Sequence, residues 1–181
     1  QGVNSLTDIT MNPRMEILAF LDVHAIPYEL YEHEPAFTIE ACMGLPFLSG
    51  DVTLCKNVFL CNRQQTDFYL MLLGPHTSFR TAVVSKALGV SRLSFAPEDA
   101  LFRLLHLRPG SVSPLGLYFD KAHAVTLCYE RAIRETARIA FHPGENNATV
   151  VFDQGVFWGR VLPLMGIGPV EVGLEVQAAD S

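Results

Sequence analysis

The sequence predicts an α+β protein with a curved, barrel-like, mostly antiparallel mixed β-sheet and flanking helices. Short runs rich in β-branched and aromatic residues come in pairs, as "RIAF" and "TVVF" do on either side of "HPGENN". Stretches with helical spacing of apolar residues lie between such runs, without a regular βαβ repeat. The chain has 181 residues, of which 49% are hydrophobic, enough for one core. We therefore expect a single domain over residues 11–176, preceded by an N-terminal extension, residues 1–10.

The first half of the chain mixes the two kinds of pattern. Helix starts are indicated by a capping residue before an apolar stretch, and a strand is indicated by alternation of apolar and polar residues. Two apolar runs with a short polar connection are typical of a hairpin. The expected elements are a helix opened by Asn12 and Pro13, a strand within 27–34, a short helix capped by Thr38 that ends at Gly44, and a hairpin of 57–62 and 67–74.

The second half continues the same alternation. Glycine marks the end of an expected helix, proline marks the start of one, and short β-branched runs indicate strands. The expected elements are a helix in 78–90 that ends at Gly89, a strand within 92–96, a helix in 97–107, a loop over 108–120, strands at 124–130, 138–141 and 149–152, a helix in 154–166 capped by Asp153, and a last strand within 169–176.

Composition excludes several classes of function. No apolar run reaches the roughly 18 to 20 residues of a membrane helix, and no secretory signal opens the chain, so we expect a cytoplasmic protein without a membrane partner. A net charge of −6 argues against wrapping DNA or a long RNA, but it allows a small local contact with nucleic acid. The four cysteines form no C-x-x-C pair, and the six histidines form no ligand cluster. We therefore expect free thiols, no metal and no cofactor.

Three polar features stand out against this background, and each has an ordinary structural explanation beside the functional one. Lys56 opens an apolar run and is either a solvated strand-end lysine or a cation presented to an ester carbonyl, a phosphate or a ribose. Gly110 and Ser111 lie in "PGSVSP", which is either a plain loop or a turn whose N–H groups converge on an oxyanion. His142 and Asn146 either shape the turn or hold a sugar hydroxyl or a catalytic water.

The order of these pieces along the chain resembles one family. "HEPAFTIEA", "KNVFL", "YLMLL", "FAPEDAL", "PGSVSPLGL" and "FHPGENNATV" follow one another as in the prolyl-tRNA synthetase-associated editing domains of the YbaK/ProX type, and most of all as in the free-standing alanyl-tRNA(Pro) deacylases. The resemblance covers nearly the whole chain. It implies the YbaK fold, a curved mixed sheet with flanking helices, and hydrolysis of amino acids wrongly loaded on tRNA(Pro).

The resemblance also implies roles for individual residues. The lysine and asparagine of the family's "KN" strand match Lys56 and Asn57, and its glycine-serine loop matches Gly110 and Ser111. Its "HPxxN" motif matches His142 and Asn146, which are then walls of a site for the 3′-terminal aminoacyl-adenosine. Asn147 stands where relatives often carry threonine and receives no role.

The implied reaction is hydrolysis of the ester in Ala-tRNA(Pro) without a covalent enzyme intermediate, because no Ser-His or Cys-His dyad is evident. A site that admits only the small amino acid corrects an error that a proline pocket cannot avoid, and Phe37 and Thr38 are its expected walls. The implied partners are the tRNA(Pro) acceptor end and prolyl-tRNA synthetase. A contact confined to the acceptor end is compatible with the acidic charge if Lys56, Arg63, Arg80 or Arg108 lies near phosphates; the alternative is that these arginines are solvated surface residues. A Cys-tRNA(Pro) deacylase, a non-catalytic aminoacyl-tRNA or nucleotide binding module, and a structural or regulatory domain are the alternatives.

Overall fold

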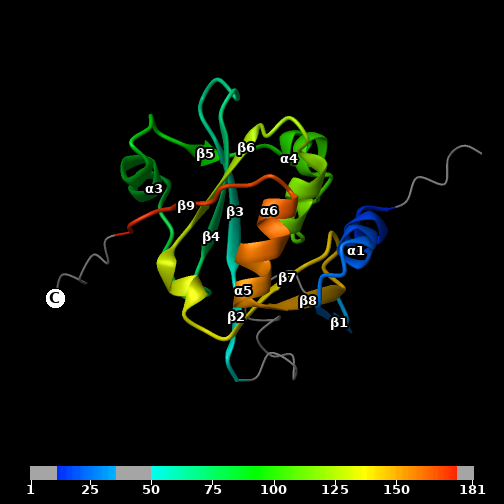
Figure 1. Cartoon of the computed structure of the whole chain (residues 1–181). Coiled ribbons are helices and arrows are strands. Elements are labelled where there is room, and N and C mark those ends of the chain that lie inside the picture. The colour runs from blue at the N-terminus through cyan, green and yellow to red at the C-terminus, as the bar shows by residue number, and fades with distance from the viewer. Residues whose placement is uncertain (1–11, 36–49, 175–181) are drawn as a thin grey trace, which may run out of the picture.

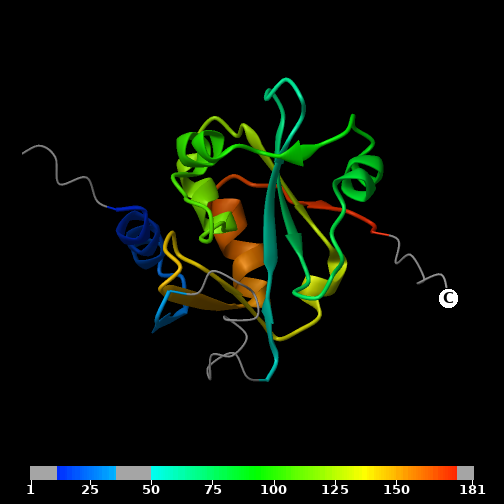
Figure 2. The same ribbon diagram turned by 180° about the vertical axis from the view of Figure 1, so that it is seen from behind.

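The computed structural model describes residues 12–35 and 50–174, which form helices and two β-sheets (Figures 1 and 2). The helices are α1 (Pro13–Val23), α3 (Thr81–Leu88), α4 (Glu98–Leu105), the 3-10 helices η2 (Pro114–Phe119) and η3 (Arg131–Arg134), and a continuous helix made of α5 (Gln154–Val156), the π-helical η4 (Phe157–Val161) and α6 (Leu162–Leu164). The strands are β1 (Glu29–Glu32), β2 (Val52–Leu54), β3 (Lys56–Cys61), β4 (Phe68–Leu73), β5 (Ser94–Phe95), β6 (Val125–Tyr129), β7 (Arg138–Phe141), β8 (Ala148–Asp153) and β9 (Val170–Glu171).

The strands form two mixed sheets, and the expected α+β class is confirmed. The order is β1-β8-β7-β2 in the four-stranded sheet and β5-β3-β4-β6-β9 in the five-stranded sheet. The β3–β4 hairpin and the β7–β8 pair are antiparallel as expected from their short connections. The pairs β2–β7, β4–β6 and β6–β9 are parallel, and they join segments that are distant in sequence.

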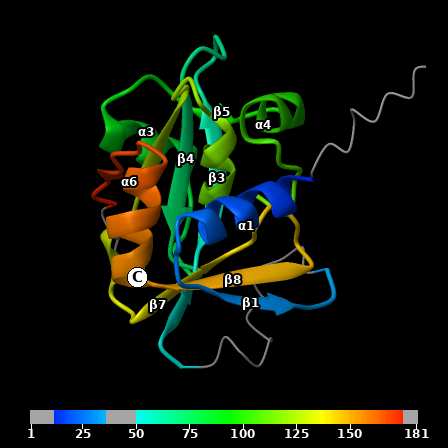
Figure 3. The same cartoon turned by 45° about the vertical axis from the view of Figure 1, so that its right-hand side comes forward.

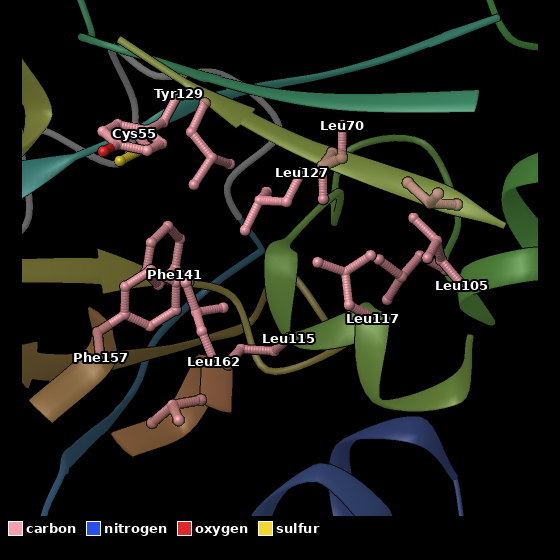
Figure 4. Packing of buried hydrophobic residues seen from close by; sticks show 14 of the residues in the cluster. Cys55, Leu70, Leu105, Leu115, Leu117, Leu127, Tyr129, Phe141, Phe157 and Leu162 are labelled. Atoms are coloured by element: carbon pink, nitrogen blue, oxygen red, sulfur yellow. The ribbon is translucent and has the colours of Figure 1, made fainter. Parts of the chain in front are cut away.

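The two sheets meet at one residue of the chain. β2 ends at Leu54 and β3 begins at Lys56, so that only Cys55 separates a strand of one sheet from a strand of the other. The Cys55 side chain is 2% exposed and belongs to the same buried cluster as Tyr129 and Phe141 (Figure 4). The chain therefore turns from one sheet to the other over an apolar residue and presents the next one, Lys56, at the first position of β3.

The helix boundaries follow the capping chemistry of the sequence. Asn12 caps α1 through its side-chain oxygen, which accepts a hydrogen bond from Met15 N at 2.9 Å. α3 ends at Gly89, whose φ of +68° is the left-handed conformation that glycine adopts without strain. Asp153 occupies the N-cap position of α5 as expected, but its side chain makes no capping hydrogen bond.

Some expectations on secondary structure were wrong. The segment Pro114–Phe119, expected as part of a loop, is the 3-10 helix η2, because Ser113 caps it and the Ser113 hydroxyl accepts from Leu115 N at 3.2 Å. Strand β2 was not predicted. The last strand is confined to Val170–Glu171 within the expected 169–176. The short helix expected after Thr38 lies outside the described residues.

The core lies between the sheets and the C-terminal helix. Phe141, Phe152 and Phe157 are the largest fully buried side chains, and Figure 4 shows Phe141 beside Phe157. Ile17 and Leu21 bring the apolar face of α1 against the same cluster. Cys55, Cys61 and Cys128 are free and buried, as expected for structural thiols; Cys42 lies outside the described residues. None of the helices in the described parts of the chain is both long and apolar enough to cross a membrane.

Candidate active site

Lys56 and Asn57 are the first two residues of β3, at the junction of the sheets. They pair with Leu73 and Leu72 of β4, and both side chains are half-buried, whereas the next four residues of the strand are buried. The Asn57 amide donates a hydrogen bond from Nδ2 to Val112 O at 2.9 Å. Its Oδ1 is buried and has no hydrogen-bond partner among the described residues. A buried acceptor without a donor is costly, so this oxygen is a position where a ligand's N–H or O–H would be favourable.

The glycine-serine loop, residues Arg108–Ser113, is fixed against the start of β3 by that bond to Val112. Gly110 has a φ of +87°, a conformation that glycine adopts without steric cost. The buried Ser111 donates from both its N–H and its hydroxyl to Arg108 O, at 3.1 and 3.0 Å. Because its own backbone donor closes the turn, Ser111 shapes the loop, and the Val112 carbonyl joins the loop to Asn57.

His142 directly follows β7 and is 9% exposed. Its Nδ1 lies 2.8 Å from Ala148 O, and because a carbonyl can only accept, Nδ1 carries the proton in the neutral ring. The His142 ring lies 6.2 Å from the ring of His33, centroid to centroid. Burial lowers the pKa of His142; the hydrogen bond to Ala148 O opposes this shift, and the nearby His33 adds to it. The structure therefore favours a neutral imidazole at this position.

The turn between β7 and β8 packs on the first turn of α1. A Cβ atom at Gly144 would lie 3.1 Å from Arg14 N and 3.2 Å from Pro13 Cβ, and the φ of Gly144 is +95°, so glycine suits this position. Glu145 accepts from Asn12 Nδ2 at 3.3 Å and lies 3.7 Å from the Arg14 guanidinium. Asn146 and Asn147 are half-buried in the same turn, and Asn147 Oδ1 is buried without a partner among the described residues. The turn therefore contains one amide oxygen, that of Asn147, that is available to a ligand.

The strand register relates Lys56 to His142. The parallel pair β2–β7 ends with Leu54 opposite Ala140, and Lys56 and His142 are each two residues further along their chains. Asn57 lies beside Lys56 and binds the glycine-serine loop. The structure therefore brings Asn57 to the loop and places Lys56 and His142 at corresponding positions just past two neighbouring strands. Asn146 follows in the turn after His142, and Phe37 and Thr38 lie outside the described residues.

Sequence reasoning overlooked His33 and Thr149. His33 follows β1, and its backbone N–H donates to the backbone carbonyl of Asn147 at 2.9 Å. Its ring Nε2 lies 2.8 Å from Thr149 Oγ1. His33 is therefore tied to the turn that holds Asn146 and Asn147. The available signal was its place in the segment 27–34, where a strand was predicted, but the pairing of β1 with β8, which brings it to this turn, could not be read from local patterns.

The chemistry of the described residues is not that of a cysteine nucleophile or of a clustered metal site. Burial raises the pKa of the Cys55 thiol, and the Glu130 carboxylate raises it further, so the reactive thiolate is disfavoured. Among residues 12–35 and 50–174, no group of three or more His, Cys, Asp or Glu side chains could hold a metal ion. The donors and acceptors gathered at the sheet junction are a lysine, amides, a neutral imidazole and backbone groups.

The pH dependence of stability should report on the buried imidazole. Because the folded state resists protonation of His142, the unfolded chain takes up that proton first, starting near the ordinary histidine pKa of about 6.5. His142 therefore contributes fully above about pH 6.5, and its contribution falls as the pH drops through the lowered folded pKa. We expect His142→Asn, which keeps a donor near Ala148 O, to flatten the loss of unfolding free energy between pH 7 and pH 5 in urea titrations. His76→Asn, at an exposed position, is the control; a wild-type slope in His142→Asn would contradict the prediction.

The comparisons with known proteins agree with this fold. The sequence profile of the aminoacyl-tRNA editing domain matches residues 33–156, which include β2, β3, the glycine-serine loop and His142. A solved structure described as a candidate trans-editing enzyme for prolyl-tRNA synthetase superimposes with a TM-score of 0.67 over 88% of this chain and 96% of that one, at 12% identity. That likeness concerns the fold alone.

Two curated proteins are similar in sequence. The prolyl-tRNA editing protein ProX of Acetoanaerobium sticklandii is 32% identical over 141 residues, 78% of this chain and 85% of that protein. The prolyl-tRNA synthetase associated domain-containing protein 1 of Danio rerio is 33% identical over 140 residues, 76% of this chain and 74% of that protein. The fold and the matched profile define an aminoacyl-tRNA editing domain. The chain belongs to the aminoacyl-tRNA editing domain family of the YbaK/ProX type.

Proposed function

We propose that this protein is a free-standing deacylase that hydrolyses mischarged Ala-tRNA(Pro) in the cytoplasm, with residues 11–176 as a single editing domain. Family membership and the similarity to a prolyl-tRNA editing protein support the reaction class. The observation that carries the proposal is the hydrogen bond from Asn57 to Val112 O, which fixes the glycine-serine loop against the residue next to Lys56. A cation, a buried acceptor and backbone donors at one place are the groups that an aminoacyl ester needs.

The proposed reaction needs no covalent enzyme intermediate. A water molecule attacks the ester carbonyl, the bond from the carbonyl carbon to the ribose oxygen breaks, and the proton passes to that oxygen, which leaves free alanine and the tRNA 3′ hydroxyl. Ser111 and Ser113 use their hydroxyl groups within the loop, and the thiol of Cys55 is buried, so none of them is a nucleophile in this scheme.

Each site residue has a proposed role in binding or in stabilising the transition state. Lys56 binds the terminal phosphate or the carbonyl end, and Asn57 Oδ1 accepts from an N–H or O–H of the aminoacyl-adenosine. The loop around Gly110 and Ser111 supplies backbone N–H groups other than that of Ser111, which is bound to Arg108 O, for the developing oxyanion, a role in which one donor commonly contributes a factor of about 100 to 1000. The neutral His142 and Asn146 hold the ribose or the attacking water.

Size selection explains why alanine is the proposed substrate. A pocket built for proline discriminates against a smaller side chain by only about 1 to 3 kcal/mol per missing methylene, so a synthetase leaves an error for a second site to remove. Phe37 and Thr38 are proposed as the walls that exclude proline from this second site. The proposed partners are the acceptor end of tRNA(Pro) and prolyl-tRNA synthetase, whose mischarged product is the substrate.

Hydrolysis of three charged tRNAs tests the proposal. We expect release of radiolabelled alanine from Ala-tRNA(Pro) to exceed the spontaneous rate by orders of magnitude, with Cys-tRNA(Pro) and Pro-tRNA(Pro) cleaved slowly or not at all. Preferred cleavage of Cys-tRNA(Pro) would make the protein a cysteinyl deacylase of the same family. Binding of all three without turnover would contradict the enzymatic proposal and leave a binding module.

A further inference from the structure

An aromatic strip runs along α4, η2 and α1 on the side of the five-stranded sheet opposite α3 (Figures 1 and 2). The strip consists of Phe102, His106, Phe119, Tyr118 and Phe20. Its consecutive ring centroids are 6.3, 4.3, 5.0 and 5.0 Å apart. The Phe102 side chain is 54% exposed and His106 is exposed, while the other three rings are half-buried. An unbroken row of rings with an exposed end offers flat apolar faces to a ligand that can stack.

Cations flank the strip. The Arg108 guanidinium lies 5.4 Å from the centroid of the Phe102 ring, and Lys121 Nζ lies 3.8 Å from that of Tyr118. Both cationic residues are exposed. The carboxylates of α4, Glu98 and Asp99, are in its first turn, at the opposite end of the helix from Arg108. Positive charge is therefore concentrated beside the rings in a chain whose net charge is −6.

A hollow of about 170 Å³ lies at the α1 end of the strip, lined in part by Phe20, Tyr118, Lys121 and His123. It is smaller than the roughly 300 to 1,000 Å³ of sites for whole drug-sized ligands, so it suits one ring or one sugar of a longer molecule. Asp120 also lines it, but its carboxylate accepts from Ala124 N and Val125 N at 3.0 and 2.8 Å. The negative charge of Asp120 is therefore stabilised by two backbone N–H groups.

The strip is continuous with the candidate active site through the chain itself. Arg108 follows α4 closely and is the first residue of the glycine-serine loop. The Val112 carbonyl of this loop accepts the hydrogen bond from Asn57. η2 then begins at Pro114 and carries two of the rings of the strip. Figure 3 shows α1 lying between β8 and α4.

We propose that the aromatic strip, with Arg108 and Lys121, is the docking surface for the RNA strand that leads to the aminoacylated 3′ end. This inference rests on the proposed deacylase function and adds to it the surface that binds the tRNA. Alternating rings and cations are what single-stranded RNA requires, since its bases stack on aromatic faces while its phosphates pair with arginine or lysine. It also resolves the conflict between an acidic protein and a polyanionic substrate, because the contact is local.

Two substrates and one binding assay test the surface. Phe102→Ala and Lys121→Ala should each lower, by about tenfold, the ratio of kcat/KM on Ala-tRNA(Pro) to kcat/KM on the alanyl ester of adenosine, which is too small to reach the strip. The loss should appear in KM. Fluorescence anisotropy with an uncharged acceptor-stem RNA ending in CCA should show the same weakening, and Lys121→Ala should reduce the slope of log affinity against log salt by about one.

Matched controls lie on the other side of the molecule. Lys86→Ala on α3 removes an exposed lysine, and Phe95→Ala on β5 removes a phenylalanine that is 64% exposed; both should match wild type in all three assays. If wild type hydrolyses Ala-tRNA(Pro) and the strip variants behave as the controls do, the surface proposal is wrong and the function stands. If wild type binds the RNA through the strip but hydrolyses nothing, the function is wrong and the surface stands. Absence of both hydrolysis and RNA binding by wild type contradicts both, and absence of RNA binding alone contradicts the surface proposal.

Discussion

Lys56→Ala should lower the single-turnover rate of alanine release from Ala-tRNA(Pro) by about 100-fold to 1000-fold, while the chain remains folded. Lys56 is half-buried at the first position of β3, next to Asn57, whose amide oxygen is buried. No other lysine or arginine lies in residues 54–57, 110–113 and 140–147. Loss of its charge therefore removes the stabilisation of a phosphate or a developing oxyanion at that point. The rate is measured with enzyme in excess, and folding by the urea midpoint.

Two companion variants make the Lys56 result specific. Lys86→Ala makes the same chemical change on α3 and should leave the rate at the wild-type value. Lys56→Arg keeps the positive charge but replaces the ammonium group by a planar guanidinium group. If Lys56 binds a phosphate, Lys56→Arg should therefore be faster than Lys56→Ala and slower than wild type. Full activity of Lys56→Ala would remove this residue from the mechanism, and an equal loss in Lys86→Ala would show that the effect is general electrostatics.

Phe157→Ala should reduce the free energy of unfolding by about 3 to 5 kcal/mol. The Phe157 side chain is fully buried in the π-helical segment η4, and its ring centroid lies 4.7 Å from that of Phe141, 5.9 Å from that of Phe152 and 5.0 Å from that of Trp158. Truncation would leave a cavity among rigid rings that belong to β7, β8 and the helix. Urea unfolding followed by circular dichroism measures the loss.

The exposed Phe95 is the matched control for the core variant. Its side chain is 64% exposed, so Phe95→Ala should cost less than about 1 kcal/mol. Because Phe141 directly precedes His142, Phe157→Ala should also slow deacylation more than the fraction of unfolded protein explains. Equal urea midpoints for the two phenylalanine variants would contradict the described core.

The sequence predicted those elements whose contacts are local. The cap at Asn12, the stop at Gly89 and the β3–β4 hairpin each depend on residues within a short stretch, and all three are confirmed. The 3-10 helix at Pro114–Phe119 was missed because its glycine and its proline are equally typical of a loop. Strand β2 was missed because three residues carry little periodicity, and its partner β7 is distant in sequence.

At the candidate site, too, the residue types could be inferred from the sequence, whereas their contacts could not. The family resemblance placed Lys56, Asn57, Gly110, Ser111, His142 and Asn146 on the list of site residues. Their arrangement depends on the parallel β2–β7 register and on the bond from Asn57 to Val112, which no local pattern contains. His33 was overlooked for the same reason, because only the β1–β8 pairing brings it to the turn after His142. Residue types at a site can therefore be inferred from order along the chain, while their contacts require the tertiary fold.

The pairing of β1 with β8 has a consequence for synthesis on the ribosome. Among the described residues, Glu29–Glu32 joins the sheet through partners in residues 148–151 and β2 joins it through β7, so the four-stranded sheet cannot close until residues 148–151 have been translated. Contacts between such distant segments are slow to form, because closing a long loop costs entropy before any contact repays it. The nascent chain should thus emerge with its N-terminal strand unpaired, and editing activity should arise late, after translation has passed residue 153.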